Sequence, residues 1–166
     1  MFLVVFVLVS QNAFAQDEYP ASLGLGVEWN MNSRLNFAGG AALGLDFNLS
    51  QAFALGFTVT GSYNFFGIAV VEPAALFRWY IPRNDSTGFF LQADVGAFLI
   101  FEEAETSQWV MVMGGLRTGY RIPLDLTWYI EPYVRAGYPF AFGVGVMTGV
   151  RFRGTSTTNT AGGQEL

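Results

Sequence analysis

The chain has 166 residues, of which 52% are hydrophobic and only 13% are charged. Because a soluble domain usually carries about 25% charged residues, this composition predicts that much of the surface does not face water. The net charge of −5 argues against nucleic acid as a partner, and the absence of Cys and His excludes disulfides, thiol catalysis, histidine-centred triads and the usual transition-metal sites.

The first 15 residues have the features of an export signal peptide. Phe2–Val9 is an apolar stretch, and Ala13–Ala15 fits the small-x-small cleavage rule, which predicts Gln16 as the first mature residue. The positively charged start of such a signal is missing, because the first basic residue is Arg34. We therefore expect a truncated signal or a misassigned start codon; a buried apolar segment is the alternative.

From Phe37 to Leu49 large apolar residues alternate with small or polar ones. Strand side chains point to opposite faces with a period of two, so this alternation predicts a strand with two unlike faces. The pattern recurs along the chain, and no apolar run reaches the roughly 18 residues of a membrane-spanning helix. The predicted strands are 20–30, 35–48, 52–64, 69–81, 88–101, 109–122, 127–138 and 142–152.

These strands and the short turns between them predict an all-β fold over residues 16–152, an eight-stranded antiparallel up-and-down transmembrane β-barrel. The interior of so small a barrel is only just wide enough to be filled by side chains. Large residues such as Phe57 and Trp79 would crowd it, whereas glycines such as Gly40 and Gly44 fit. We therefore expect the small face inside and the large face in lipid, the reverse of a soluble lipocalin-type barrel.

Strand parity also places charged residues on the small face. They are Glu28, Asp46, Glu72, Asp94, Glu131, Arg78, Arg117, Arg121, Arg135 and Arg151. Buried charges need partners, and bidentate pairs between arginine and carboxylate suit that role. Folding the hairpins about their turns predicts a network of Asp94, Arg117, Glu131 and Arg151 that leaves no wide aqueous pore. Glu72, Arg78, Arg121 and Arg135 are expected to belong to the same set of lumen ion pairs. Scattered surface charges are the alternative.

Two further residue types mark positions along the strands. Trp29, Trp79 and Trp128 lie near strand ends on the lipid face, which is typical of an aromatic girdle at the membrane boundaries. Pro73 and Pro132 cannot donate ladder hydrogen bonds, and a closed barrel has no free edge for them. We therefore expect local bulges at both prolines.

Three stretches carry a resemblance to a known family: Phe89–Gly96, Tyr129–Tyr138 and the strand-final Gly149–Phe152. Through them, residues 19–152 resemble the small outer-membrane barrels of diderm bacteria, of the OmpA, OmpX and OmpW type. The resemblance implies a bacterial outer-membrane location, contact with outer-membrane lipids and both chain ends in the periplasm. It also implies that Phe152 is the aromatic that the outer-membrane assembly machinery reads. The tail 153–166, rich in Thr and Gly, departs from that pattern and is expected to be disordered.

The leading functional hypothesis is a structural surface barrel with a largely filled, salt-bridged lumen. One alternative is an OmpW-like passive route for small hydrophobic molecules with a lateral opening to lipid. Another is adhesion through short surface loops, of which only Glu102–Gln108 is distinctly acidic. Paired carboxylates could in principle support catalysis, but the arginines offer them a simpler structural role, so we expect neither an enzyme nor a cofactor. The sequence leaves the oligomeric state open.

Overall fold

The computed structural model describes residues 19–32, 36–64, 67–81, 87–102 and 108–154. None of the described residues forms a helix long and apolar enough to cross a membrane. The strands are β1 Ala21–Met31, β2 Phe37–Asn48, β3 Phe53–Asn64, β4 Ile68–Ile81, β5 Gly88–Glu102, β6 Gln108–Pro123, β7 Trp128–Tyr138 and β8 Phe142–Phe152. The eight predicted strands are therefore confirmed, each with its ends within two residues of the expected ones.

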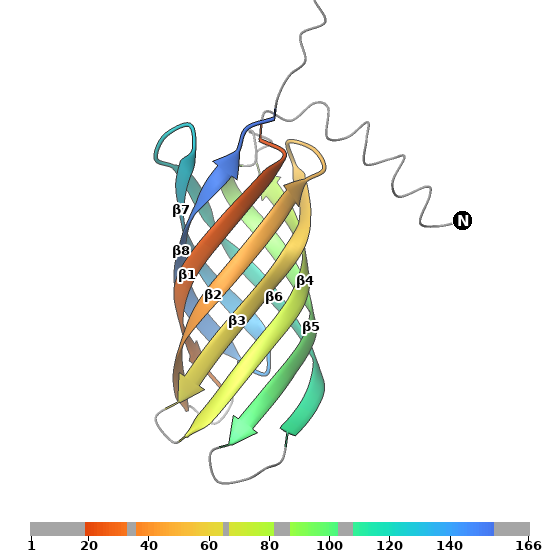
Figure 1. Ribbon diagram of the computed structural model, residues 1–166, viewed down its shortest axis with the longest axis vertical. Coiled ribbons are helices and arrows are strands. Elements are labelled where there is room, and N and C mark those ends of the chain that lie inside the picture. The colour runs from red at the N-terminus through yellow and green to blue at the C-terminus, as the bar shows by residue number, and fades with distance from the viewer. Residues whose placement is uncertain (1–18, 33–35, 65–66, 82–86, 103–107, 155–166) are drawn as a thin grey trace, which may run out of the picture.

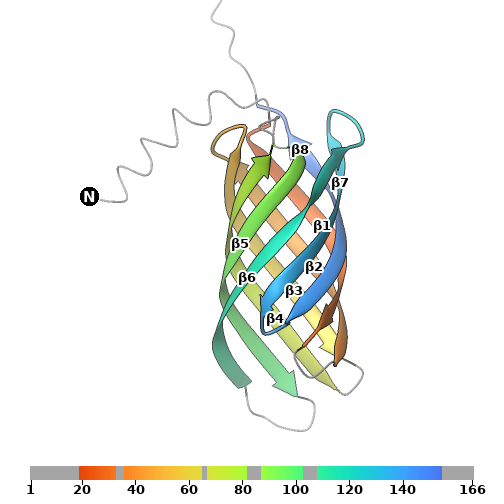
Figure 2. The same ribbon diagram turned by 180° about the vertical axis from the view of Figure 1, so that it is seen from behind.

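The strands form a closed antiparallel barrel in chain order, with β8 pairing back onto β1 (Figure 1, Figure 2). A path through paired residues that leaves β7 at Trp128 and passes once around all eight strands returns to β7 at Tyr138, ten residues further on. Such a stagger requires the strands to tilt against the barrel axis, as Figure 1 shows. The expected fold class is confirmed.

Local hydrogen bonds explain where several strands begin. Ser50 accepts at its backbone oxygen from the N–H of Phe53, 3.2 Å away, which closes the turn into β3. Asp125 Oδ1 accepts from the N–H groups of Thr127 and Trp128, each at 2.6 Å, at the start of β7. Gly88 opens β5 with a φ of 91°, a left-handed conformation that glycine adopts without strain. These three strands begin at the proximal end, our term for the end of the barrel from which the chain termini leave (Figure 1).

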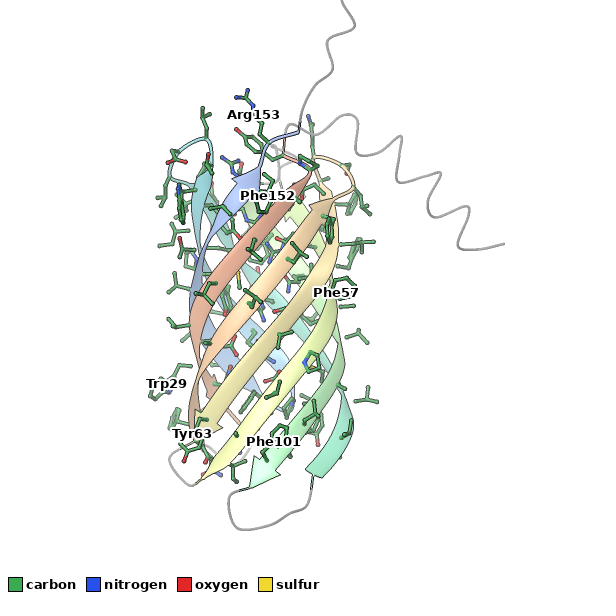
Figure 3. The ribbon with its side chains drawn as sticks, viewed as in Figure 1. Trp29, Phe57, Tyr63, Phe101, Phe152 and Arg153 are labelled. Atoms are coloured by element: carbon green, nitrogen blue, oxygen red, sulfur yellow. The ribbon has the colours of Figure 1, made fainter. Side chains whose placement is uncertain are left out.

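Burial alternates along the strands as the sequence predicts. The outward face is apolar and exposed over its middle, with Leu25 at 61%, Phe57 at 62% and Val95 at 64% exposure. Trp29, Tyr63 and Phe101 lie toward the distal end, away from the termini, whereas Phe152 lies at the proximal end beside Arg153 (Figure 3). The exterior therefore carries an apolar band with aromatic side chains toward both ends.

The inward side chains are larger than expected. Aromatic side chains share it with glycines and charged residues: Tyr80, Phe90, Phe98, Tyr129 and Tyr133 are all buried. Glycines on neighbouring strands make room for them, since a Cβ added at Gly145 would lie 2.5 Å from Tyr133 Cζ. The sequence analysis assigned none of these five side chains to a face. Strand parity alone would have placed them inside.

The bulges expected at Pro73 and Pro132 are also wrong. Pro73 keeps its partner Val59 in β3, and the β4–β5 ladder is interrupted beside it without a change of register. The β6–β7 ladder is interrupted in the same way beside Pro132. A proline lacks its backbone N–H, so one ladder hydrogen bond toward one neighbouring strand is lost. The pairing with the other neighbour is kept, and the strand needs no extra residue.

The remaining sequence predictions concern the ends of the chain and the tryptophans. Residues 1–15 and 155–166, which hold the expected signal peptide and most of the tail, lie outside the described residues. Trp29, Trp79 and Trp128 point outward and are 41–50% exposed. That orientation is compatible with the expected girdle, which stays a prediction.

Candidate functional site: the charged interior of the barrel

The ten charged residues that strand parity placed on the small face all point inward, and each is at most 7% exposed. Their strands alternate inward and outward residues, so every second position supplies the lumen. Removing so many charges from water is costly unless each finds a partner. Their contacts therefore determine what the interior can do.

The central feature, which we call the proximal quartet, consists of Asp46, Arg78, Arg121 and Glu131, from β2, β4, β6 and β7. Arg78 Nη1 lies 3.1 Å from Asp46 Oδ2 and 3.0 Å from Glu131 Oε2. Arg121 reaches the same two oxygens at 2.7 and 2.6 Å. Each arginine thus bridges both carboxylates, and the four charges cancel.

Side chains from other strands surround this quartet. Ser22 in β1 donates to Asp46 and accepts from Arg121 Nη1, at 3.2 and 3.1 Å. Gln92 in β5 accepts from Arg78 Nε at 2.8 Å. Aromatic rings cover the guanidinium planes, with Arg121 4.1 Å from the ring of Tyr129. Six of the eight strands therefore contribute polar side chains to one connected cluster.

A second ion-pair cluster lies on the distal side. Arg135 in β7 binds Glu28 in β1 at 3.0 Å and Glu72 in β4 at 2.6 Å. The hydroxyl of Tyr133 donates to Glu28 at 2.9 Å. Asn30 also donates to Glu28 and, at 3.0 Å, to Ser62. We call Glu28, Glu72 and Arg135 the distal triad; its two carboxylates share one arginine.

Asp94 and Arg117 form a looser pair, with Arg117 Nε 3.7 Å from Asp94 Oδ2. Arg117 also stacks 4.4 Å from the ring of Tyr133, and Gln92 donates to Asp94. Arg151, at the proximal end, donates to the backbone oxygens of Asp125 and Leu126 at 2.9 and 3.4 Å. This arginine makes no ion pair among the described residues.

Comparisons with known proteins identify the fold. No protein-family model matches the sequence, and no curated protein sequence matches it. The N-terminal β-barrel domain of Pseudomonas aeruginosa OprF superposes with a TM-score of 0.54 and 13% identity over 79% of this chain and 97% of that one. Neisserial surface protein A (NspA) superposes with a TM-score of 0.61 and 10% identity over 81% and 96%. The fold is that of an eight-stranded outer-membrane barrel.

Within this transmembrane barrel, the four-residue network expected from sequence is only partly present. Asp94 and Arg117 are neighbours, but Glu131 binds Arg78 and Arg121 instead of Arg117 and Arg151. The β6–β7 hairpin is centred on Leu126 rather than on the two preceding residues, as its pairs Gly119–Tyr133 and Ile122–Ile130 show. That centre puts Arg121 opposite Glu131. In β8, Glu131 pairs with Met147, four residues from Arg151.

Sequence reasoning missed the two residues that complete these clusters. Glu28 and Asp46 were placed on the inner face but were given no partner, although each binds an arginine on a strand that is not its neighbour. Parity identifies the face of a residue, but not which residues meet across the lumen.

The site offers little for metal or acid–base chemistry. Among the described residues, no three His, Cys, Asp or Glu side chains gather in a way that could hold a metal ion. The inward carboxylates face guanidinium groups. Outside the membrane-spanning strands, hydrogen bonds from the N–H of Trp128 and then of Thr127, reinforced by Arg151, hold the pKa of Asp125 below its ordinary value of 3.8. Asp125 is fully exposed, and its contacts are those of a turn.

Proposed function

We propose that the protein is an integral bacterial outer-membrane barrel with a structural surface role, whose interior is closed by ion pairs. The apolar exterior supports this location, because membrane barrels turn a band of apolar residues toward lipid. Side chains such as Leu25, Phe57 and Val95 would be unfavourable in water at their observed exposure. The likeness of the fold to two outer-membrane barrels supports the same location.

The proximal quartet is the observation that carries the closed interior. It connects four strands around the barrel, and Arg121 and Glu131 have no exposed surface at all. A water-filled passage would wet these side chains. The distal triad adds a second crossing, because Arg135 in β7 binds Glu28 in β1, two strands away past β8, and Glu72 in β4, three strands away in the other direction. Two such layers hold opposite walls together and leave no wide pore.

The remaining partners follow from the same role. We propose that the outward tryptophans Trp29, Trp79 and Trp128 form the boundary girdles toward outer-membrane lipids. Phe152, the exposed last residue of β8, is the proposed assembly signal. No catalytic role is proposed, since the inward carboxylates are engaged with arginines and the sequence holds no His or Cys.

Single-channel recording in planar lipid bilayers tests the closed interior. The wild-type barrel should show no stable, large conductance steps. An R78S/R121S variant removes both bridging cations of the quartet and should open steps that the wild type lacks. An R151S variant, which removes an inward arginine without an ion pair, serves as the matched control. Stable, large steps in the wild type would overturn the proposal.

A second candidate is a passive route for small hydrophobic molecules with a lateral opening to lipid. The ladder interruptions beside Pro73 and Pro132 favour it, because each weakens the pairing between two neighbouring strands at that point. Uptake of a small hydrophobic dye into vesicles tests it, and a rate equal to that of protein-free vesicles would exclude it. The adhesion alternative rests on an acidic segment whose residues 103–107 lie outside the described residues, and it stays a prediction.

A further inference from the structure

A cavity of about 460 Å³ lies at the distal end of the barrel. We call it the distal cavity. Its lining includes Val70, Phe98, Ile100 and Phe140, together with Asn36 and Asn64. Its volume is within the roughly 300–1,000 Å³ that is typical of small-molecule sites.

The apolar part of the lining belongs to a buried cluster of Ala74, Phe98 and Met113, with Val70 and Ile100 packed against it. The charged quartet lies proximally, beside a second buried cluster that includes Tyr80 and Phe90. A barrel that needed only to be closed could continue with polar side chains there. Apolar walls in a lumen favour a ligand with an apolar part.

Two buried acceptors belong to residues that neighbour the lining of this cavity. Asn30 pairs with Ala38, which lines the cavity, and Glu72 lies two residues from Val70 on the same face of β4. Asn30 Oδ1 and Glu72 Oε1 have no hydrogen-bond partner, and their side chains are at most 1% exposed. An unsatisfied buried acceptor is unfavourable, so this position favours a ligand that brings hydrogen-bond donors.

The charges near the cavity also favour a ligand with a positive charge, because acidic side chains outnumber basic ones there. In the distal triad, Glu28 and Glu72 face one cation, Arg135, whereas Asp94 and Arg117 form a pair that is neutral by itself. The proximal quartet is neutral by itself. One negative charge is therefore left over beneath the distal cavity.

We propose that the distal cavity binds a cationic amphiphile, an alkyl chain that ends in a primary ammonium group. An ammonium group has three N–H donors and no acceptor, which complements Asn30 Oδ1, Glu72 Oε1 and the unbalanced negative charge. The alkyl chain packs against Phe98, Ile100 and Val70. The quartet beneath holds the ligand at the distal end, so this site binds and does not conduct.

Beside the cavity, the barrel wall formed by β7 and β8 ends closer to the proximal end than the wall formed by β5 and β6. Residues Gln108–Met113 of β6 pair with β5 but extend past the end of β7, whose first pair with β6 from the distal end is Tyr138 with Gly114. The distal ends of β5 and β6 consequently lie beyond the β7–β8 turn (Figure 1, Figure 2). That turn supplies Pro139 and Phe140 to the cavity lining. An amphiphile can therefore enter at this notch from the surrounding lipid.

Binding of n-octylammonium to the full chain in lipid nanodiscs tests the proposal, with backbone amide NMR shifts as the readout. Saturable shifts are expected at Ala38, Val70 and Ile100. Octanol, which has the same chain without the charge, and octanoate should bind more weakly. An E72Q variant should bind octylammonium about tenfold more weakly, the loss expected for a hydrogen bond to a charged group.

Two variants complete the experiment. D125N removes one carboxylate at the opposite end of the barrel and should leave octylammonium binding unchanged. A38F fills the cavity while keeping Glu72, so it should abolish binding even if E72Q fails to fold. If octanol binds as tightly as octylammonium, the proposal is overturned. That result is expected if water alone provides the donors for Asn30 Oδ1 and Glu72 Oε1. Shifts confined to the outer wall, or unchanged binding to A38F, would also overturn the proposal.

Discussion

Replacing Arg121 by methionine tests whether the proximal quartet stabilises the barrel through its charges. Arg121 has no exposed surface and contacts Glu131 at 2.6 Å, Asp46 at 2.7 Å and Ser22 at 3.1 Å. Methionine keeps most of the length of the side chain but removes the charge and all three contacts. Asp46 and Glu131 would then share Arg78 alone.

The expected loss is large because two buried carboxylates remain. Removing one partner of a buried ion pair typically costs about 3–5 kcal/mol, a large share of the roughly 5–15 kcal/mol that stabilises a folded protein. R151M is the control, because Arg151 makes no ion pair among the described residues; it donates to two backbone oxygens and stacks on the ring of Tyr19. Two neutral acceptors predict a smaller loss, about 1–3 kcal/mol.

Reversible unfolding in denaturant from lipid vesicles, followed by tryptophan fluorescence, measures both losses. A double variant, R121M/E131Q, separates charge from packing. It restores neutrality, so it should be less destabilised than the sum of the two single variants, by about 0.5–3 kcal/mol. The charge argument is refuted if R121M loses no more than R151M, or if the effects of R121M and E131Q simply add.

Three other outcomes are expected. Gly145→Ala should cost about 1–3 kcal/mol by overpacking, because its Cβ would displace Tyr133, whereas Gly61→Ala, with nothing within 4 Å, should leave the unfolding midpoint unchanged. Asp125→Asn should lower the midpoint at neutral pH; the lowered pKa means that this difference shrinks as the pH falls below the ordinary 3.8, and a constant difference would contradict the reasoning. Pro73→Val restores an N–H group that faces β5, so hydrogen exchange should detect one additional slowly exchanging amide at this position. If no additional amide is protected, the β4–β5 ladder is disturbed by more than the missing N–H group.

How far the sequence predicts the fold can be judged from particular residues. The period of two comes from strand geometry and needs no tertiary information, so Phe57 and Val95 were assigned outward and Asp46 and Arg78 inward from the pattern alone. The same parity holds for Tyr133, whose place inside the lumen was not predicted. Glycine positions such as Gly145 create the room for its ring, which an average interior width does not describe.

Contacts across the lumen are a different kind of information. Hairpin pairing depends on where each turn is centred. The β6–β7 turn is centred on Leu126, one to two residues later than predicted, and for this reason Arg121 rather than Arg117 lies opposite Glu131. Asp46 and Arg78 lie on strands that do not pair, so no hairpin argument could join them. Their contact depends on closure and on the ten-residue stagger around the barrel.

The sequence by itself therefore determined the strands, the barrel class and the face of nearly every residue, because alternation is local and lipid demands an apolar exterior. Only the tertiary structure decided which charges meet, where the interior leaves a cavity and which acceptors remain unsatisfied. Those features arise when side chains from distant strands fill one narrow lumen. Their arrangement is set by stagger, turn position and packing together.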